Sequence, residues 1–206
     1  MLDFFGSVFV TSGPVLGLIA LVCAYFIGNI SPATLIAKAE GVDIRKEGSG
    51  NPGTTNVLRV LGKKEAVGTL VIDIIKGAAA VLLGKFVGGE ALALLCGFTA
   101  FVGHVWPAVF HFKGGKGVAT AFGVLLATNY IVALLCLASA GLGALVSRRM
   151  SIGSIVGAVA LVIIGCFLTP KYVAIFAVMA LIVIYKHRGN IKRIISGDEP
   201  KLKFKK

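Results

Sequence analysis

Long apolar runs that carry almost no charge are the feature that most restricts how this chain can fold. Hydrophobic residues make up 57% of the 206 residues, and charged residues make up only 15%. A soluble fold cannot bury so much apolar surface, which excludes a soluble enzyme and a disordered chain. Because the apolar runs are continuous rather than alternating, they predict membrane-spanning helices and not the strands of a barrel.

Each apolar run of suitable length is a candidate span, since about 20 residues of helix cross the hydrocarbon core of a bilayer. We expect spans at residues 14–35, 66–83, 91–110, 152–168 and 172–185. A sixth run, residues 118–146, is too long for one span and short for two.

Basic residues resolve this ambiguity, because Lys and Arg in short loops mark the cytoplasmic side. Most of the 21 cations fall in four segments, residues 38–64, 111–117, 148–149 and 186–206. To bring all four segments to one side, the chain must cross twice within 118–146, turning near Thr128-Asn129, and twice within 152–185, turning at residues 169–171. The sequence therefore predicts an all-α polytopic membrane protein with seven transmembrane helices, N-terminus outside and C-terminus cytoplasmic. The fourth and seventh passes, residues 118–128 and 172–185, are short, so we expect the helices to tilt or the bilayer to thin locally there.

The same charge distribution bears on domains and partners. We expect one membrane domain over residues 1–206, with a basic tail from about residue 201. The net charge is +12, and most of the basic residues are expected to lie on one side of the membrane, as membrane insertion needs. We therefore exclude nucleic acid as a partner and expect only attraction of the tail to anionic lipid.

Gly153 and Gly157 have the small-xxx-small spacing that allows two helices to pack closely.

A first polar segment lies between residues 48 and 59. Its glycines have the GxGxxG spacing, but no apolar strand precedes them and there is no room for a βαβ unit, so we reject a dinucleotide site. We interpret the segment as a turn and a short helix whose amides, hydroxyls and arginine face one ligand. A capped connecting loop is the alternative. The candidate binding residues are Ser49, Asn51, Asn56 and Arg59.

A second polar segment, residues 103–120, contains four consecutive residues, Gly114-Gly115-Lys116-Gly117. Phe110 and Gly117 stand where a Walker A loop needs Gly and Ser or Thr, so an ATP site of that kind is unsupported. Glycine amides before a helix, together with a lysine, nevertheless favour binding of an anion, and we expect phosphate as the ligand. The alternative is a tight turn with a snorkelling lysine. We expect His104, at the end of a span, to be structural.

A third polar segment covers residues 186–199. His187 and Asn190 are three residues apart, so on a helix they share a face. The alternative is a basic helix end that lies on lipid headgroups. Glu199 is expected to form an ion-pair clamp with Arg59 or Arg193.

Asp73 and Lys76 are two charges inside the second span, also three residues apart. Charges at that depth are costly and are usually paired or functional. They form either a neutralising pair or the floor of a polar cavity, and both readings stay open.

These residues also limit the chemistry. Three dispersed histidines and few carboxylates make a metal hydrolase improbable, and we expect neither a metal nor a cofactor. No histidine is followed five residues later by Asp, and a G-x-S-x-G elbow is absent. The remaining set can bind phosphate twice and stabilise negative charge, which suits transfer from a phosphorylated lipid-soluble donor to a phosphorylated polar acceptor. An organic-phosphate transporter and a non-catalytic subunit that binds anionic lipid are the competing classes.

The three polar segments, in this order, resemble those of the bacterial acyl-phosphate:glycerol-3-phosphate acyltransferases, the PlsY family, over residues 28–199. Residues 28–32 read GNISP where the family usually has GSIP, and Thr54 replaces a common Ala. The resemblance implies transfer of a fatty acyl group from acyl phosphate to the 1-hydroxyl of sn-glycerol 3-phosphate, giving lysophosphatidic acid and phosphate. It further implies a bacterial plasma (inner) membrane protein, with its site at the cytoplasmic face. We expect it to act as a monomer.

On this resemblance, catalysis falls to His187, Asn190, Ser49 and Lys116. Phosphate is held by Ser49, Arg59, Lys116 and the glycines Gly114, Gly115 and Gly117, while Asn51 and Asn56 order the loop or donate to oxygens of the acyl donor. His187 and Asn190 orient the glycerol hydroxyl. Either His187 is the general base, or the leaving phosphate takes the proton and His187 is only its hydrogen-bond partner. Structural support is assigned to Glu199, Asp73, Lys76 and His104.

Overall fold

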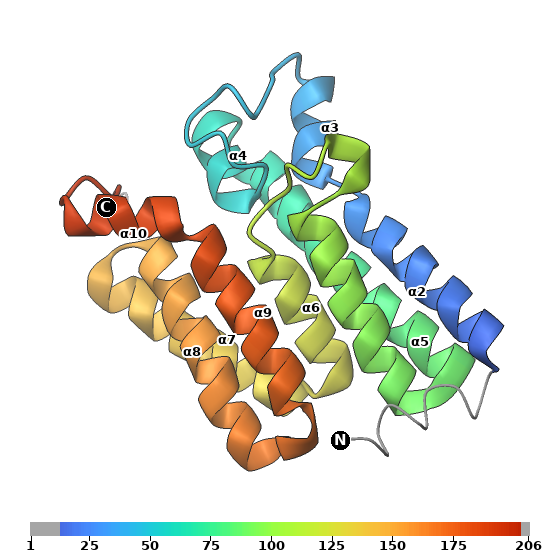
Figure 1. Ribbon diagram of the computed structural model, residues 1–206. Helices are drawn as coiled ribbons and strands as arrows, with labels where there is room; N and C mark the ends of the chain where they lie inside the picture. Colours follow the sequence, from blue (N-terminus) through green and yellow to red (C-terminus); the bar gives the residue numbers. More distant parts are fainter. Residues whose placement is uncertain (1–12, 203–206) are drawn as a thin grey trace. The chain divides into compact units, whose positions relative to one another are not determined.

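The computed structural model describes residues 13–202, which form helices and connecting loops with no strand among them (Figure 1). These residues divide into two compact units at the Thr128–Asn129 bond. The single domain expected over residues 1–206 therefore stays a prediction. Beyond Leu202, the predicted basic tail lies outside the described residues.

The first unit begins with two helices in place of the continuous one expected over residues 14–35. Helix α2 (Pro14–Asn29) ends before Ser31, and α3 (Pro32–Ala39) begins directly after it. Pro32 explains the break, because proline restricts the residue before it and is favoured in the first turn of a helix. Ser31 caps α3 through its hydroxyl, which accepts from the Thr34 amide at 3.4 Å.

A short helix, α4 (Thr54–Val60), precedes the long α5 (Lys63–Val105), which folds back on itself. Gly88 and Gly89 have non-helical backbone angles, and Gly89 has a φ of 74°, which favours glycine. In a straight helix, Lys76 and His104 would lie about 42 Å apart. Their side chains are instead 2.8 Å apart, so residues 63–87 and 90–105 are two legs of a hairpin. The span predicted at residues 66–83 falls in the first leg, and the one predicted at 91–110 begins in the second leg and extends past its end at Val105.

The first unit closes with the short turn η1 (Ala108–Phe110) and α6 (Val118–Thr128). Both α2 and α6 pack against α5, and Figure 1 shows α2 running beside it. Helix α6 has 11 residues, which confirms that this segment is short for a span.

The second unit consists of α7 (Tyr130–Ser147), α8 (Met150–Leu168), the turn η2 (Pro170–Tyr172), α9 (Val173–Lys186) and α10 (Arg188–Ile195). Asn129 caps α7, and its Oδ1 accepts from the amides of Ile131 and Val132. The helix boundaries predicted near residue 129 and at residues 169–171 are thus confirmed.

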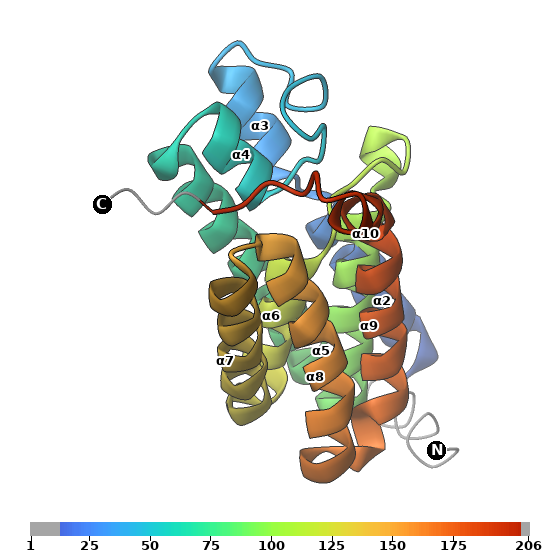
Figure 2. The ribbon, with the colours of Figure 1, turned by 90° about the vertical axis from the view of Figure 1, so that its left-hand side faces the viewer.

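In this unit α8 packs against α7 and α9, as Figure 2 shows. The close packing predicted for Gly153 and Gly157 is present between α7 and α8. A Cβ at Gly153 would lie 2.7 Å from Cβ of Ala144, and one at Gly157 would lie 2.9 Å from Cβ of Ala140. Only glycine allows this approach. Helix α10 continues from α9 after a bend of 55°.

Four helical stretches among the described residues are long and apolar enough to cross a membrane: Pro14–Ala39, Lys63–Phe110, Tyr130–Ser147 and Met150–Leu168. The bent pair of α9 and α10 makes a fifth at most. This supports a chain with several membrane spans. The count of seven and the orientation of the termini stay predictions.

Candidate functional site

The loop between α3 and α4 is ordered from inside by Asn56. Its Oδ1 accepts a hydrogen bond of 2.8 Å from the Ser49 amide, and its Nδ2 donates to the carbonyls of Ile44 and Glu47 at 3.1 and 3.0 Å. Asn56 is only 1% exposed. Of the two roles open for it, ordering the loop is the one the structure supports. Both of its N–H groups have acceptors within the loop, and its assignment to phosphate binding stays a prediction.

The other candidates in this segment lie nearer the surface. Ser49 and Arg59 are exposed and Asn51 is half-buried. Ser49 follows Gly48, whose φ of 58° makes a tight turn beside Asn56. Asn56 thus fixes the backbone at Ser49, and Arg59 follows on α4.

The glycine-rich segment, residues 114–117, packs directly on the end of α5. The Gly115 amide donates to the carbonyl oxygen of His104 at 3.2 Å. A Cβ added at Gly115 would overlap Nε2 of the His104 ring and would lie 3.2 Å from the Pro52 carbonyl oxygen. Thus the first and second polar segments, far apart in sequence, contact each other within the first unit.

Arg45, just before the first polar segment, makes a second connection to the second segment, which sequence reasoning did not find. Its Nη2 donates to the Lys113 carbonyl at 3.1 Å, and its guanidinium lies 4.9 Å from the centre of the Phe110 ring. Arg45 thereby ties the loop before α4 to the residues that precede the glycine-rich segment.

Tyr25 and Asn29 of α2 hold the chain between α5 and the glycine-rich segment. The Tyr25 hydroxyl donates to the Trp106 carbonyl at 2.8 Å and accepts from the Ala108 amide at 3.0 Å. Asn29 Oδ1 accepts from the Val109 amide at 3.2 Å. These pairs are about 80 residues apart and leave no local sequence signal, although Asn29 lies in the segment compared with the GSIP motif.

A buried charged triad lies beneath the same segment. Lys76 Nζ is 2.7 Å from Asp73 Oδ1, donates to His104 Nδ1 at 2.8 Å, and donates to the Ile30 carbonyl at 2.6 Å. Of the two readings left open for Asp73 and Lys76, the ion pair is the one observed, with His104 as a third member. All three side chains are buried, so the network holds both legs of α5 to the break between α2 and α3.

In the second unit, His187 lies where α9 ends and α10 begins. Its Nδ1 is 2.8 Å from the Val183 carbonyl oxygen, which can only accept, so Nδ1 carries the proton. Nε2 of the neutral ring is then the nitrogen able to accept one. His187 is 2% exposed and Asn190 is 7% exposed. His187 directly precedes α10, and Asn190 lies in its first turn.

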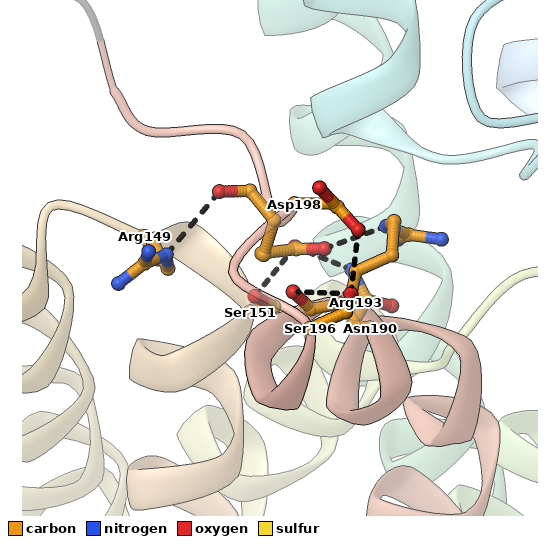
Figure 3. A network of polar contacts seen from close by, with 7 residues as sticks. Arg149, Ser151, Asn190, Arg193, Ser196 and Asp198 are labelled. Atoms are coloured by element: carbon orange, nitrogen blue, oxygen red, sulfur yellow. Dashed lines mark hydrogen bonds and ion pairs between the residues drawn. The ribbon is translucent and has the colours of Figure 1, made fainter.

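Glu199 is the centre of a polar network that fastens the chain after α10 (Figure 3). Its carboxylate accepts from Ser151 at 2.7 Å, from Asn190 at 2.7 Å and from Arg193 Nε at 2.8 Å. Arg149 Nε donates to its carbonyl at 3.2 Å. Of the two ion-pair partners predicted for Glu199, Arg59 and Arg193, the observed one is Arg193. Ser151, on α8, was not foreseen, because its hydroxyl lies 48 residues before its partner.

This environment keeps Glu199 ionised. Burial by itself raises the pKa of the carboxyl group, but hydrogen bonds from Ser151, Asn190 and Arg193, with the charge of Arg193, outweigh it. The pKa of Glu199 is consequently below its ordinary value of 4.5.

The structure thus joins the candidates in two groups. The first unit contains Ser49, Asn51, Arg59 and the glycine-rich segment over the buried triad, and the second contains His187 and Asn190 on the Glu199 network. Convergence of these groups on one ligand stays a prediction. Among residues 13–202, no three His, Cys, Asp or Glu side chains gather as metal ligands would.

Comparison with known proteins identifies the family. The sequence model of the family described as glycerol-3-phosphate acyltransferase matches residues 18–197. The glycerol-3-phosphate acyltransferase of Clostridioides difficile (strain 630) is 44% identical, over 92% of this chain and 97% of the relative. That of Jannaschia sp. (strain CCS1) is also 44% identical, over 93% and 95%.

Solved structures agree with these relatives. The crystal structure of PlsY, an integral membrane glycerol 3-phosphate acyltransferase, in its glycerol 3-phosphate form has a TM-score of 0.86 and 35% identity, over 91% of this chain and 96% of that one. The lysophosphatidic acid form has a TM-score of 0.83 at the same identity, over 90% and 94%. On the family match and these relatives together, the chain belongs to the glycerol-3-phosphate acyltransferase family.

Proposed function

We propose that this protein transfers a fatty acyl group from acyl phosphate to the 1-hydroxyl of sn-glycerol 3-phosphate, giving lysophosphatidic acid and inorganic phosphate. One observation carries the proposal: the family match extends over residues 18–197 and so includes the first and second polar segments and His187 with Asn190. The relatives are glycerol-3-phosphate acyltransferases, and the two PlsY structures are in glycerol 3-phosphate and lysophosphatidic acid forms.

Two phosphorylated reactants need two sets of anion-binding groups. The glycine-rich segment supplies Lys116 and backbone N–H groups other than that of Gly115, which donates to His104. The first segment supplies Ser49, Asn51 and Arg59. The contact between Gly115 and Pro52 supports the idea that these groups act together. We assign phosphate binding to this assembly, with Asn56 as the residue that orders it.

The reaction itself is an acyl substitution. The 1-hydroxyl oxygen of glycerol 3-phosphate attacks the carbonyl carbon of acyl phosphate, an ester C–O bond forms, and the C–O bond to phosphate breaks. Phosphate leaves with the bonding electron pair, so the donor is already activated and no protein nucleophile is required. Positive charge and N–H donors around the leaving phosphate stabilise the charge that develops on it.

The hydroxyl proton has two possible acceptors. His187 Nε2 carries a lone pair if Nδ1–H is held by Val183, as the 2.8 Å contact indicates, which suits a general base. The leaving phosphate oxygen is the other acceptor, with His187 only orienting the hydroxyl. His187→Gln decides between them: loss of most of kcat supports the base, and retention of most of kcat supports transfer to phosphate.

We further propose seven membrane passes in the bacterial plasma (inner) membrane, with the site at the cytoplasmic face and the acyl chain lying between helices. This places the three polar segments on the side where the basic residues lie. It requires that the hairpin of α5 and the helices after it each cross the bilayer.

An assay of the purified protein tests this function. Palmitoyl phosphate and radiolabelled glycerol 3-phosphate are incubated with the enzyme in detergent, and labelled lysophosphatidic acid and released phosphate are measured. Equal amounts of both products are expected. A parallel incubation with palmitoyl-CoA tests the choice of donor, and product from that donor alone would contradict the assignment of acyl phosphate. Label that crosses sealed proteoliposomes without forming product would indicate an organic-phosphate transporter.

A further inference from the structure

The buried triad of Asp73, Lys76 and His104 lies outside the reacting groups of the proposed mechanism, yet it touches the segment that we assign to phosphate. Lys76 Nζ has three short contacts, to a carboxylate, an imidazole and a backbone carbonyl. The contact with Asp73 is an ion pair, and those with His104 and the Ile30 carbonyl are hydrogen bonds. The position of Lys76 is therefore fixed from three directions.

This arrangement fixes the His104 ring as well. An ammonium group only donates, so Nδ1 of His104 accepts from Lys76 at 2.8 Å and the proton of the neutral ring is on Nε2. Asp73 Oδ1 lies 3.3 Å from the same Nδ1 and is ion-paired with the Lys76 ammonium. One edge of the imidazole is thereby held by the triad, while the opposite edge faces Gly115.

Gly115 requires glycine because of that ring. A Cβ at this position would overlap Nε2 and would lie 2.9 Å from Cε1 of His104, and the next atom, the Pro52 oxygen, is 3.2 Å away. The backbone of Gly115 does not have a positive φ, so an alanine would suit it if the ring were absent. The constraint at Gly115 therefore comes mainly from one side chain.

Gly114 offers a matched contrast one residue earlier. A Cβ there would overlap the backbone carbonyl oxygen of His104 and would lie 2.8 Å from the Val105 carbonyl and 2.5 Å from Cδ of Pro107. Removing the His104 side chain relieves none of these contacts. Two neighbouring glycines thus depend on the same residue through different atoms.

We propose that His104 is a positioning residue for the phosphate-binding segment: its imidazole, held by Lys76 and Asp73, is the surface that sets the position of Gly115 and of Lys116 beside it. The inference rests on the proposed function, because it takes residues 114–117 to bind phosphate. A displacement of about 1 Å at such a segment is expected to cost about 100-fold in activity.

A double-mutant cycle tests the contact. Gly115→Ala and Gly114→Ala are each made alone and together with His104→Ala, and equilibrium binding of radiolabelled glycerol 3-phosphate is measured alongside kcat and KM. Gly115→Ala is expected to lower kcat/KM about 100-fold in the natural chain but only a few-fold in the His104→Ala chain. Gly114→Ala is expected to cost the same in both. An equal cost of Gly115→Ala in both backgrounds would overturn the inference.

His104→Asn separates positioning from mere stability. The Asn Oδ1 takes the place of Nδ1 and still accepts from Lys76, but the ring edge against Gly115 is lost. We expect a melting temperature near that of the natural chain, with weaker glycerol 3-phosphate binding or a higher KM for acyl phosphate by about tenfold. Unchanged binding and KM would show that His104 only satisfies Lys76, and would overturn the proposal.

The binding measurement also separates this inference from the proposed function. Because binding needs no turnover, a natural chain that binds glycerol 3-phosphate but forms no lysophosphatidic acid would overturn the acyl-transfer proposal alone. The binding constants of the same glycine and histidine variants would then still decide the role of His104.

Discussion

Asn190 donates a hydrogen bond of 2.7 Å to Oε1 of Glu199, so a candidate catalytic side chain on α10 is held by a carboxylate nine residues later in the chain. Ser151 of α8 donates to the same oxygen. The segment after α10 therefore acts as a strap that joins two helices and fixes the orientation of Asn190.

Neutralising this carboxylate is expected to loosen the strap. Glu199→Gln keeps the size of the side chain but removes the ion pair with Arg193 and exchanges one acceptor oxygen for a donor. We expect a loss of about 1–3 kcal/mol in the free energy of unfolding, measured by thermal unfolding in detergent, and lower acyl transfer through a displaced Asn190. Asp198→Asn, at an exposed neighbour, is the control and should stay within about 0.5 kcal/mol. Equal effects of the two substitutions would contradict the strap.

Acid should weaken the protein through the same group. The folded-state pKa of Glu199 lies below its ordinary value of 4.5, so its contribution to stability is present in full above about pH 4.5 and is lost as the pH falls through the lower, folded-state pKa. Melting temperatures measured between pH 7 and pH 3 should fall at the acid end. Glu199→Gln should show a smaller fall, and an identical fall in both proteins would exclude Glu199 as a cause.

Removing the positive charge of the glycine-rich segment should nearly abolish activity. Loss of one donor to a developing charge costs about 10²–10³ in rate, so we expect Lys116→Ala to lower kcat by that factor in the palmitoyl phosphate assay. Lys113→Ala removes an exposed lysine three residues earlier and should leave kcat near that of the natural chain. A kcat of Lys116→Ala equal to that of the natural chain would refute the assignment of phosphate binding to this segment.

The predicted topology can be tested with single cysteines in a chain whose four native cysteines have been replaced. Cysteine at Lys85 or Lys171 should react with a membrane-impermeant maleimide applied to intact cells, because both positions lie in loops predicted outside. Cysteine at Lys113 or Arg148 should react only after the membrane is permeabilised. Labelling of all four positions from outside would contradict the one-sided arrangement of the basic segments.

Much of the helix pattern could be predicted from local sequence. The turn of the α5 hairpin at Gly88-Gly89 follows from two apolar runs separated by glycines and charge, and the start of α7 follows from a polar residue, Asn129, that caps it. The break at Ser31 was missed, because the apolar run continues through Pro32 and hydropathy outweighed the proline in the prediction.

The site was predictable where its contacts are local. Asp73 and Lys76 are three residues apart on one helix, and that spacing made their pairing one of the two readings of the sequence. The contacts of Arg45 with Lys113 and of Tyr25 with Trp106 were not predictable, because they join residues 68 and 81 positions apart through single hydrogen bonds to backbone carbonyls. Such contacts depend on the folded arrangement of the helices and leave no pattern in a single sequence.

The central claim is that Ser49, Lys116 and His187 act on one small molecule. An experimental structure of this protein with glycerol 3-phosphate bound measures this most directly, through the distances from the ligand to Ser49 Oγ, Lys116 Nζ and His187 Nε2. We predict that phosphate oxygens lie within about 3.5 Å of groups in the first unit and that the 1-hydroxyl lies within about 3.5 Å of His187. A ligand that contacts only one of the two units, with His187 out of reach of the hydroxyl, would contradict the account.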